Sequence, residues 1–448
     1  MKILLIMPDA GIHRLALGAW GISFREAPLT LTTLAALVPA ELNASVRLVD
    51  ESIEPLPSEK VRYDLVGISC LTGTATRAYA IADRYRKAGV PVILGGVHVG
   101  LRMEEAREHA DSIVVGDARS SWPGLLRDFS RGTLQPVYRS KSSGLDQWPT
   151  ARRDLQRRFG YMTPYTVMAT RGCRNTCDFC SIPAARYGWH TRPVAQVIDE
   201  IASLPARRFV FNDVSLLEDR SYAMELFSAL APLKKVWGGL CTTRIGDDDE
   251  MLELMARSGC IYLLIGFESV RDASLEGIGK AFNRSASYPL LMAKLHAYDI
   301  VVQGCFIFGL DGDGIDIFEQ TTDLVDRLKI DIPRYAIYTP YPGTTAFDKL
   351  QSQGRILHED WRYYDTQHVV YRPAGMTVPQ LDEGFRRSWE HTYGLRSIRR
   401  RTLRPSRNAL ISVVGNLAYR RYISRLRRDG DRIKAQDENS DAYTACAA

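Results

Sequence analysis

Long apolar runs and paired cysteines are both missing from this 448-residue sequence. No stretch reaches the roughly 20 consecutive apolar residues of a membrane-spanning helix, so we expect no such helix. Only three of the eight cysteines cluster, which excludes the paired framework of a small secreted protein and favours a reducing cytoplasm. The N-terminal MKILLIMPDAG has one lysine and a short apolar run that ends at a proline, which predicts a buried strand rather than a signal peptide.

Acidic residues are absent between Arg396 and Arg428, although the net charge of the whole chain is only +6. Within this segment, residues 408–428 place apolar side chains at near-helical spacing among arginines. The pattern is typical of a helix on an anionic membrane surface, which would make the protein peripheral at the inner membrane face. Packing against the rest of the chain, or nonspecific nucleic-acid contact, would also explain it. We expect no specific nucleic-acid partner.

Short apolar runs alternate with amphipathic segments over the first part of the chain, residues 1–135. The predicted strands are residues 2–7, 45–50, 65–70, 91–96 and 112–116, and the predicted helices include residues 29–38, 76–87 and 103–109. Such runs are typical of buried parallel strands with helical crossovers. The pattern therefore predicts that these residues form an α/β, Rossmann-like domain, which would bind its ligand at the carboxyl ends of the strands.

A second alternating series follows a polar linker, residues 136–160, and occupies residues 161–345. Its predicted strands are residues 165–170, 208–212, 236–243, 262–267, 301–309 and 334–339. Six βα units predict a partial (β/α)6 barrel of TIM type with its chemistry at the C-terminal ends of the strands. We expect a helical region, residues 346–430, that caps the barrel mouth, and a disordered tail, residues 431–448.

Three cysteines, Cys173, Cys177 and Cys180, lie in TRGCRNTCDFCS directly after the first barrel strand. Thiolates are the usual ligands of iron–sulfur clusters, and three of them on a tight loop would leave one iron of a [4Fe–4S] cluster open. Structural zinc is the alternative, but it normally requires a fourth ligand at matching spacing, and His190 is ten residues further on. The motif therefore predicts a metal cluster with catalytic function.

This loop, with Phe179 before its last cysteine, resembles the signature of the radical S-adenosylmethionine (SAM) superfamily. The segments FNDVSLLED, GFESV and GCFIFGLDGD extend the resemblance to the subgroup with an N-terminal cobalamin-binding domain, which includes hopanoid and bacteriochlorophyll-pathway methylases. The resemblance implies three cofactors, namely a [4Fe–4S] cluster, SAM and cobalamin. It also implies a 5′-deoxyadenosyl radical and a low-potential electron donor such as ferredoxin or flavodoxin.

The resemblance also implies roles for single residues after the barrel strands. Asn212 and Asp213 fall where the amino group of SAM is held, and the subgroup often has two aspartates there. Arg244 would pair with the methionyl carboxylate, for which a planar guanidinium is well suited. Glu268 would bond the ribose hydroxyls. Two further residues would flank the adenine, Phe308 and Gly309.

Small and polar residues at the strand ends of the first domain are the candidates for cobalamin contact, since glycine lets a bulky ligand approach the backbone. They are Ser69, Thr72, Gly73, Gly95, Gly96 and Gly116. The lower-ligand motif D-x-H-x-x-G is missing, because the loop after the first strand has His13 at a different spacing. If cobalamin binds, its nucleotide base would lie in the sheet crevice and no protein histidine would ligate cobalt.

Our first functional hypothesis is a methyltransferase that methylates an unactivated carbon of a small-molecule substrate. A cobalamin-binding radical SAM enzyme that forms a ring or oxidises its substrate is the alternative. An electron-transfer or regulatory protein is a third, disfavoured by the polar groups at the barrel strand ends. The basic C-terminal segment and the related methylases point to a hydrophobic substrate, an isoprenoid lipid or a tetrapyrrole.

Overall fold

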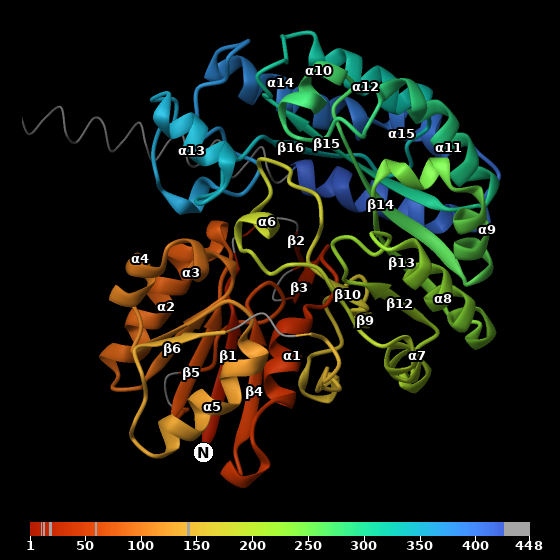
Figure 1. Ribbon diagram of the computed structural model, residues 1–448. Coiled ribbons are helices and arrows are strands. Elements are labelled where there is room, and N and C mark those ends of the chain that lie inside the picture. The colour runs from red at the N-terminus through yellow and green to blue at the C-terminus, as the bar shows by residue number, and fades with distance from the viewer. Residues whose placement is uncertain (10, 12–13, 18–19, 59–60, 141–143, 425–448) are drawn as a thin grey trace, which may run out of the picture.

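The computed structural model describes residues 1–424 apart from residues 10, 12–13, 18–19, 59–60 and 141–143. The chain folds into two parallel-sheet domains and a largely helical C-terminal region (Figure 1). The predicted α/β class is confirmed. In the described part of the chain, no helix is long and apolar enough to cross a membrane. The tail predicted to be disordered, residues 431–448, lies outside the described residues.

The first domain is built on a six-stranded parallel sheet with the strand order β4-β1-β5-β6-β7-β8. Its strands are β1 (Lys2–Met7), β4 (Ser45–Asp50), β5 (Leu65–Ser69), β6 (Val92–Gly95), β7 (Ser112–Val115) and β8 (Val137–Arg139). The first five coincide with predicted strands, because each is a short apolar run that helices cover on both faces. The strand β8 differs from the prediction, since it pairs with β7 inside the segment expected to be a linker.

Helices cover both faces of this sheet, as a Rossmann-like domain requires. One face packs against α1 (Leu29–Ala36) and α5 (Ala118–Ser130). The other face packs against α2 (Ala75–Lys87), α3 (Val97–Leu101) and α4 (Met103–Glu108). An antiparallel hairpin that the sequence did not predict lies between β1 and α1, formed by β2 (Arg14–Leu17) and β3 (Trp20–Ser23).

The second domain contains the six predicted parallel strands in the order β9-β12-β13-β14-β15-β16. They are β9 (Thr166–Val167), β12 (Arg208–Phe211), β13 (Val236–Cys241), β14 (Cys260–Glu268), β15 (Val301–Phe308) and β16 (Arg334–Ile337). The helices are α7 (Val194–Ser203), α8 (Arg220–Leu230), α9 (Asp249–Arg257), α10 (Asp272–Gly277), α11 (Tyr288–Ala297) and α12 (Ile317–Arg327). They lie along the outside of the curved sheet (Figure 1), which gives a partial barrel.

The C-terminal region contacts both domains. It contains α13 (Thr345–Ser352), α14 (Val378–Thr392), α15 (Leu395–Thr402) and a helix over residues 409–424, where the described residues end. Phe347 and Trp361 belong to the apolar core of the first domain, whereas Trp389 and Tyr419 belong to the core of the barrel. Packing against the rest of the chain, one of the explanations considered for this basic segment, is therefore confirmed for the side of the 409–424 helix that faces the barrel.

Candidate active site

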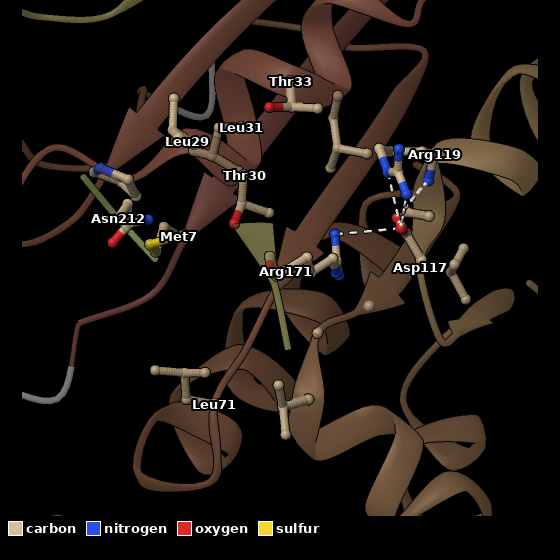
Figure 2. A pocket seen from close by; sticks show the side chains of 18 of the residues that line it. Met7, Leu29, Thr30, Leu31, Thr33, Leu71, Asp117, Arg119, Arg171 and Asn212 are labelled. Carbon is tan, nitrogen blue, oxygen red and sulfur yellow. Dashed lines mark hydrogen bonds and ion pairs between the residues drawn. The ribbon is translucent and has the colours of Figure 1, made fainter. Parts of the chain in front are cut away.

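A cavity of about 460 Å³ lies where the carboxyl ends of the first domain's strands meet the second domain. Met7 lines it from the first domain and Asn212 from the barrel side (Figure 2). Ser69 and Gly116 of the first domain and Thr170 near the barrel also line it. Parallel strands of a doubly wound sheet bind ligands at this edge. The two domains thus share one candidate ligand site.

Four of the residues predicted to contact cobalamin line this cavity: Ser69, Gly95, Gly96 and Gly116. Gly96 has φ +106°, and a Cβ on it would lie 2.3 Å from the carbonyl oxygen of Cys70, so only glycine fits there. Thr72 and Gly73 are not among the lining residues. Thr72 Oγ1 lies 3.2 Å from Nδ1 of buried His98, and Gly73 lies against the carbonyl of Tyr364 in the C-terminal region.

The part of the cavity between the sheet and helices α1 and α5 is apolar. Leu34, Ile93, Val114 and Trp122 line it, and the Trp122 indole N–H is occupied by the carbonyl of Leu34 at 3.1 Å. Gly67 also lines this part, and a Cβ there would lie 2.8 Å from the side chain of Leu5, so the packing of Leu5 requires a glycine. A flat, largely apolar ring system such as a nucleotide base fits these walls.

The other corner of the cavity is charged and joins the two domains. Asp117, which follows β7, lies 2.6 Å from Nη2 of Arg119 and 3.3 Å from Nη1 of Arg171 (Figure 2). Burial raises the pKa of Asp117, but its hydrogen bonds to Arg119 and the charge of Arg171 outweigh burial and lower it. Arg171 belongs to β10 (Thr170–Arg171), two residues before Cys173. This cluster could not be predicted from the sequence, because Arg171 lies more than fifty residues after Asp117 and Arg119 and in the other domain.

The three cysteines of the predicted cluster lie on one loop between β10 and α6 (Ser181–Ala184), and all three are free thiols. The Cys173 thiol donates to Glu218 at 3.3 Å, and burial raises the pKa of Cys177 to about 12. Among the residues described, no three or more His, Cys, Asp or Glu side chains are gathered as for a metal ion. The loop fits an iron–sulfur cluster by its donor chemistry alone, since it carries three cysteines and thiolates are the usual ligands of such clusters.

Asp213 fixes the beginning of this loop. Its buried carboxylate accepts hydrogen bonds from the backbone N–H groups of Ala169 and Thr170 and, at 2.7 Å, from the Thr170 hydroxyl. Burial raises the pKa of Asp213 to about 7. Its neighbour Asn212 instead lines the cavity of the first domain (Figure 2). The structure thus separates the two residues predicted to hold the amino group of SAM.

Glu268 and Arg244 are held differently. Glu268 has φ +62° and is buried against Lys280, whose Nζ lies 2.5 Å from its carboxylate. Burial lowers the pKa of Lys280, but the Glu268 charge outweighs burial and raises it. Arg244 is exposed, with its guanidinium 4.1 Å from the ring centroid of Phe282. Sequence reasoning missed Lys280, because its sequence context matches no motif.

Phe308 lies at the end of β15 among aromatic side chains, and Gly309 follows it with its N–H donating to the carboxylate of Asp313 at 3.1 Å. Phe308 is fully buried, with ring-centroid distances of 4.9 Å to Phe318 and 5.2 Å to Tyr335. The carbonyl of Gly309 accepts a hydrogen bond from the hydroxyl of Tyr371. Both residues support the barrel end, and their predicted contact with adenine stays a prediction.

Comparison with known proteins matches both halves of the site. Residues 167–325 match the family model of the radical SAM superfamily, and residues 25–126 match that of the B12-binding domain. The chain is 32% identical over 376 residues, 80% of either chain, to bacteriochlorophyllide d C-12(1)-methyltransferase of Chlorobaculum tepidum. It is 28% identical to the C-8(2)-methyltransferase of the same organism, over 88% of this chain and 92% of that one.

A solved structure shows the same fold. The radical SAM methyltransferase TsrM from Kitasatospora setae, with cobalamin and a [4Fe–4S] cluster bound, gives a TM-score of 0.61 at 17% identity over 79% of this chain and 78% of that one. Together, the fold and the cysteine loop define a radical SAM enzyme with a B12-binding domain. The chain belongs to the family of cobalamin-binding radical SAM enzymes. Its cofactors are a [4Fe–4S] cluster, SAM and cobalamin.

Proposed function

We propose that the chain is a cobalamin-dependent methyltransferase that methylates an unactivated carbon of a small-molecule substrate. The shared cavity supports this proposal most directly, because the strand ends of the B12-binding domain and residues 170–172, directly before Cys173, line the same space. When bound, the cluster with SAM supplies the radical that takes a hydrogen atom from the substrate, and cobalamin supplies the methyl group.

The protein's own residues hold and orient these groups. Cys173, Cys177 and Cys180 would hold the cluster as thiolates. Asp213 fixes the backbone from which their loop starts, and it acts as a positioning residue. The ion pair between Asp117 and Arg171 ties that loop to the cobalamin cavity.

Contacts with SAM are proposed for two residues that the sequence suggested. Arg244, which is exposed and lies over the Phe282 ring, would pair with the methionyl carboxylate. Glu268 would accept from the ribose hydroxyls, with Lys280 holding its carboxylate in place. Asn212 lines the cavity shared with cobalamin, and its contact with the amino group of SAM stays a prediction.

A tetrapyrrole is the substrate class that we propose. Two relatives that align with most of this chain are named as methyltransferases of bacteriochlorophyllide d. The proposed substrate is thus a large, mostly apolar ring system. An isoprenoid lipid is the competing class, and a low-potential ferredoxin or flavodoxin is the proposed electron donor.

We propose that the helix over residues 409–424 also holds the enzyme on an anionic membrane surface. Its buried face packs on the barrel through Asn416 and Tyr419. Its outer face exposes an apolar row with i, i+3, i+4 and i+7 spacing, formed by Leu410, Val413, Val414 and Leu417. Exposed arginines flank this row: Arg407, Arg420 and Arg421. This combination of apolar and basic side chains suits anionic lipid headgroups.

The test is anaerobic turnover of the reconstituted enzyme with a low-potential reductant, a bacteriochlorophyllide and SAM that carries a deuterated methyl group. We expect a product whose mass rises by one labelled methyl group, and only when cobalamin is present. A product with altered mass but no label would contradict methyl transfer and support ring formation or oxidation. Labelled product from an isoprenoid but not from the tetrapyrrole would reject the proposed substrate class alone.

A further inference from the structure

Arg25 lies on the segment between β3 and α1, at the boundary between the two domains. The backbone N–H of Ser23 donates to the carbonyl of Gly160 at 2.7 Å, so the segment runs beside the chain that leads into β9, the edge strand of the barrel. The ring of Phe24 lies 5.3 Å from that of Tyr419, measured between centroids, and so packs on the C-terminal helix. These contacts hold Arg25 where its side chain lines the shared cavity.

Three described arginines line this cavity, and they differ in their partners. Arg119 and Arg171 share the carboxylate of Asp117. Arg25 is half-buried, and its guanidinium forms no hydrogen bond or ion pair with a described residue, since only its backbone N–H is bonded, to Ser23 Oγ at 3.2 Å. A guanidinium that is partly removed from water without a counter-charge is unfavourable, so one that faces a cavity indicates an anionic group of a ligand.

The groups around Arg25 do not balance its charge. Burial lowers the pKa of Arg25, and the positive charge of Arg334 lowers it further. The carboxylates of Asp9 and Asp50 act in the opposite direction but do not outweigh these two effects. A bound anion would stabilise the charged guanidinium at this point.

Glu26, the neighbour of Arg25 in the chain, lies near a different guanidinium. Arg334 is on β16, in register with Cys305 of β15. Burial lowers the pKa of Arg334, but the groups around it outweigh burial and raise it, namely Tyr419, Cys305, Tyr422 and Glu26. The carboxylate of Glu26 therefore acts on Arg334, and it forms no ion pair with Arg25 in the described part of the chain.

The proposed substrate class carries one group that fits Arg25. A bacteriochlorophyllide is a tetrapyrrole whose propionate is a free carboxylic acid, ionised at neutral pH, at the edge of a mostly apolar ring system. An isoprenoid hydrocarbon carries no anion. A planar guanidinium binds a carboxylate through two parallel hydrogen bonds, which gives both affinity and orientation.

We propose that Arg25 binds the free propionate carboxylate of the tetrapyrrole substrate and thereby selects the acid over its esters. This inference rests on the proposed function, because it requires a tetrapyrrole in the shared cavity. Arg25 is a specificity-determining residue for the substrate. It has no part in radical formation or methyl transfer.

The test measures the binding of two pigments, bacteriochlorophyllide d and its propionate methyl ester, to the anaerobically reconstituted enzyme with its cluster and cobalamin. Equilibrium dialysis gives dissociation constants for the wild type and for Arg25→Gln, which keeps a polar side chain without the charge. We expect Arg25→Gln to weaken binding of the acid by about 10- to 100-fold, the value of a charge-assisted hydrogen bond, and binding of the ester by less than about threefold.

Two further variants control for charge and for folding. Arg25→Lys keeps the positive charge, and we expect it to retain part of the preference for the acid. Arg152→Gln removes an exposed arginine that pairs with Asp154 outside the cavity, and it should change the binding of neither pigment. Retained cobalamin is measured for every variant and should equal that of the wild type.

Three results would contradict the account. Equal weakening of acid and ester by Arg25→Gln, or unchanged binding of both, would overturn the proposal. Loss of cobalamin from Arg25→Gln but not from Arg152→Gln would also overturn it, because the arginine would then bind an anionic group of the cofactor. Failure of both pigments to bind the wild type would instead contradict the proposed substrate class, and this inference with it.

Discussion

Asp213 shows how one buried carboxylate can organise a cofactor loop. Its oxygens accept hydrogen bonds from two backbone N–H groups and from the Thr170 hydroxyl, all before the first cysteine of the motif. The same burial disfavours the ionised form and raises the pKa of this aspartate to about 7. The protonation state of Asp213, which holds the backbone of the loop, therefore changes near neutral pH.

We predict a pH-dependent contribution of Asp213 to stability. An unfolded aspartate titrates at about pH 4, so between about pH 4 and pH 7 the folded state holds a proton that the unfolded state has lost. The stabilisation is complete below about pH 4 and is lost as the pH rises through 7. Urea unfolding of the cluster-free wild type and Asp213→Asn measures it: the stability of the wild type relative to the variant should fall between about pH 4 and 7. If the difference in stability between the wild type and the variant stayed the same at every pH, the raised pKa of Asp213 would be contradicted.

We predict that the buried ion pair of Asp117 and Arg119 contributes more to the stability of the fold than an exposed ion pair with similar geometry. Asp117→Asn leaves two guanidiniums without their carboxylate, so we expect a loss of about 3 kcal/mol in the free energy of unfolding. Asp154→Asn removes the partner of exposed Arg152, and we expect a loss below about 0.5 kcal/mol. Urea unfolding measures both, and equal losses would refute the structural role of Asp117.

At the scale of elements, strands were predicted better than contacts. Every predicted strand exists, because short apolar runs between turn residues leave few other structures open to them. The strand β8 was missed, since its three residues form no recognisable run. Thr72 and Gly73 were assigned to cobalamin from their place after β5, yet their partners include Tyr364, nearly three hundred residues later in the chain. Such partners follow from the tertiary fold and not from local pattern.

The helix over residues 409–424 provides the prediction at this scale. We expect the wild type to float with vesicles rich in phosphatidylglycerol and not with phosphatidylcholine alone, since both apolar and basic side chains contribute. Leu410→Ser with Leu417→Ser should abolish flotation without changing cobalamin binding. The matched control is Leu290→Ser with Ile315→Ser, which are exposed to similar extents, 61% and 57%, elsewhere on the molecule. Flotation that persists in the first variant would reject the membrane surface.

Across the whole molecule, the C-terminal region joins the two cofactor domains. Trp361 donates to Glu105 of α4 at 2.9 Å, and Arg102 lies 2.9 Å from Glu359, while α14 and α15 pack on the barrel. The cysteine motif alone predicted the cluster chemistry, because its three ligands are adjacent in sequence. The junction between Asp117 and Arg171 could not be predicted, because it forms only when the two domains meet.

The most direct test of the central claim measures 5′-deoxyadenosine and retained cobalamin in one anaerobic experiment with reconstituted protein, SAM and a low-potential reductant. We predict both signals for the wild type and for Cys241→Ala, which removes a buried cysteine outside the loop. Cys177→Ala should keep cobalamin and lose deoxyadenosine. Wild-type protein with a full complement of iron and sulfide that forms no deoxyadenosine and retains no cobalamin would contradict the account.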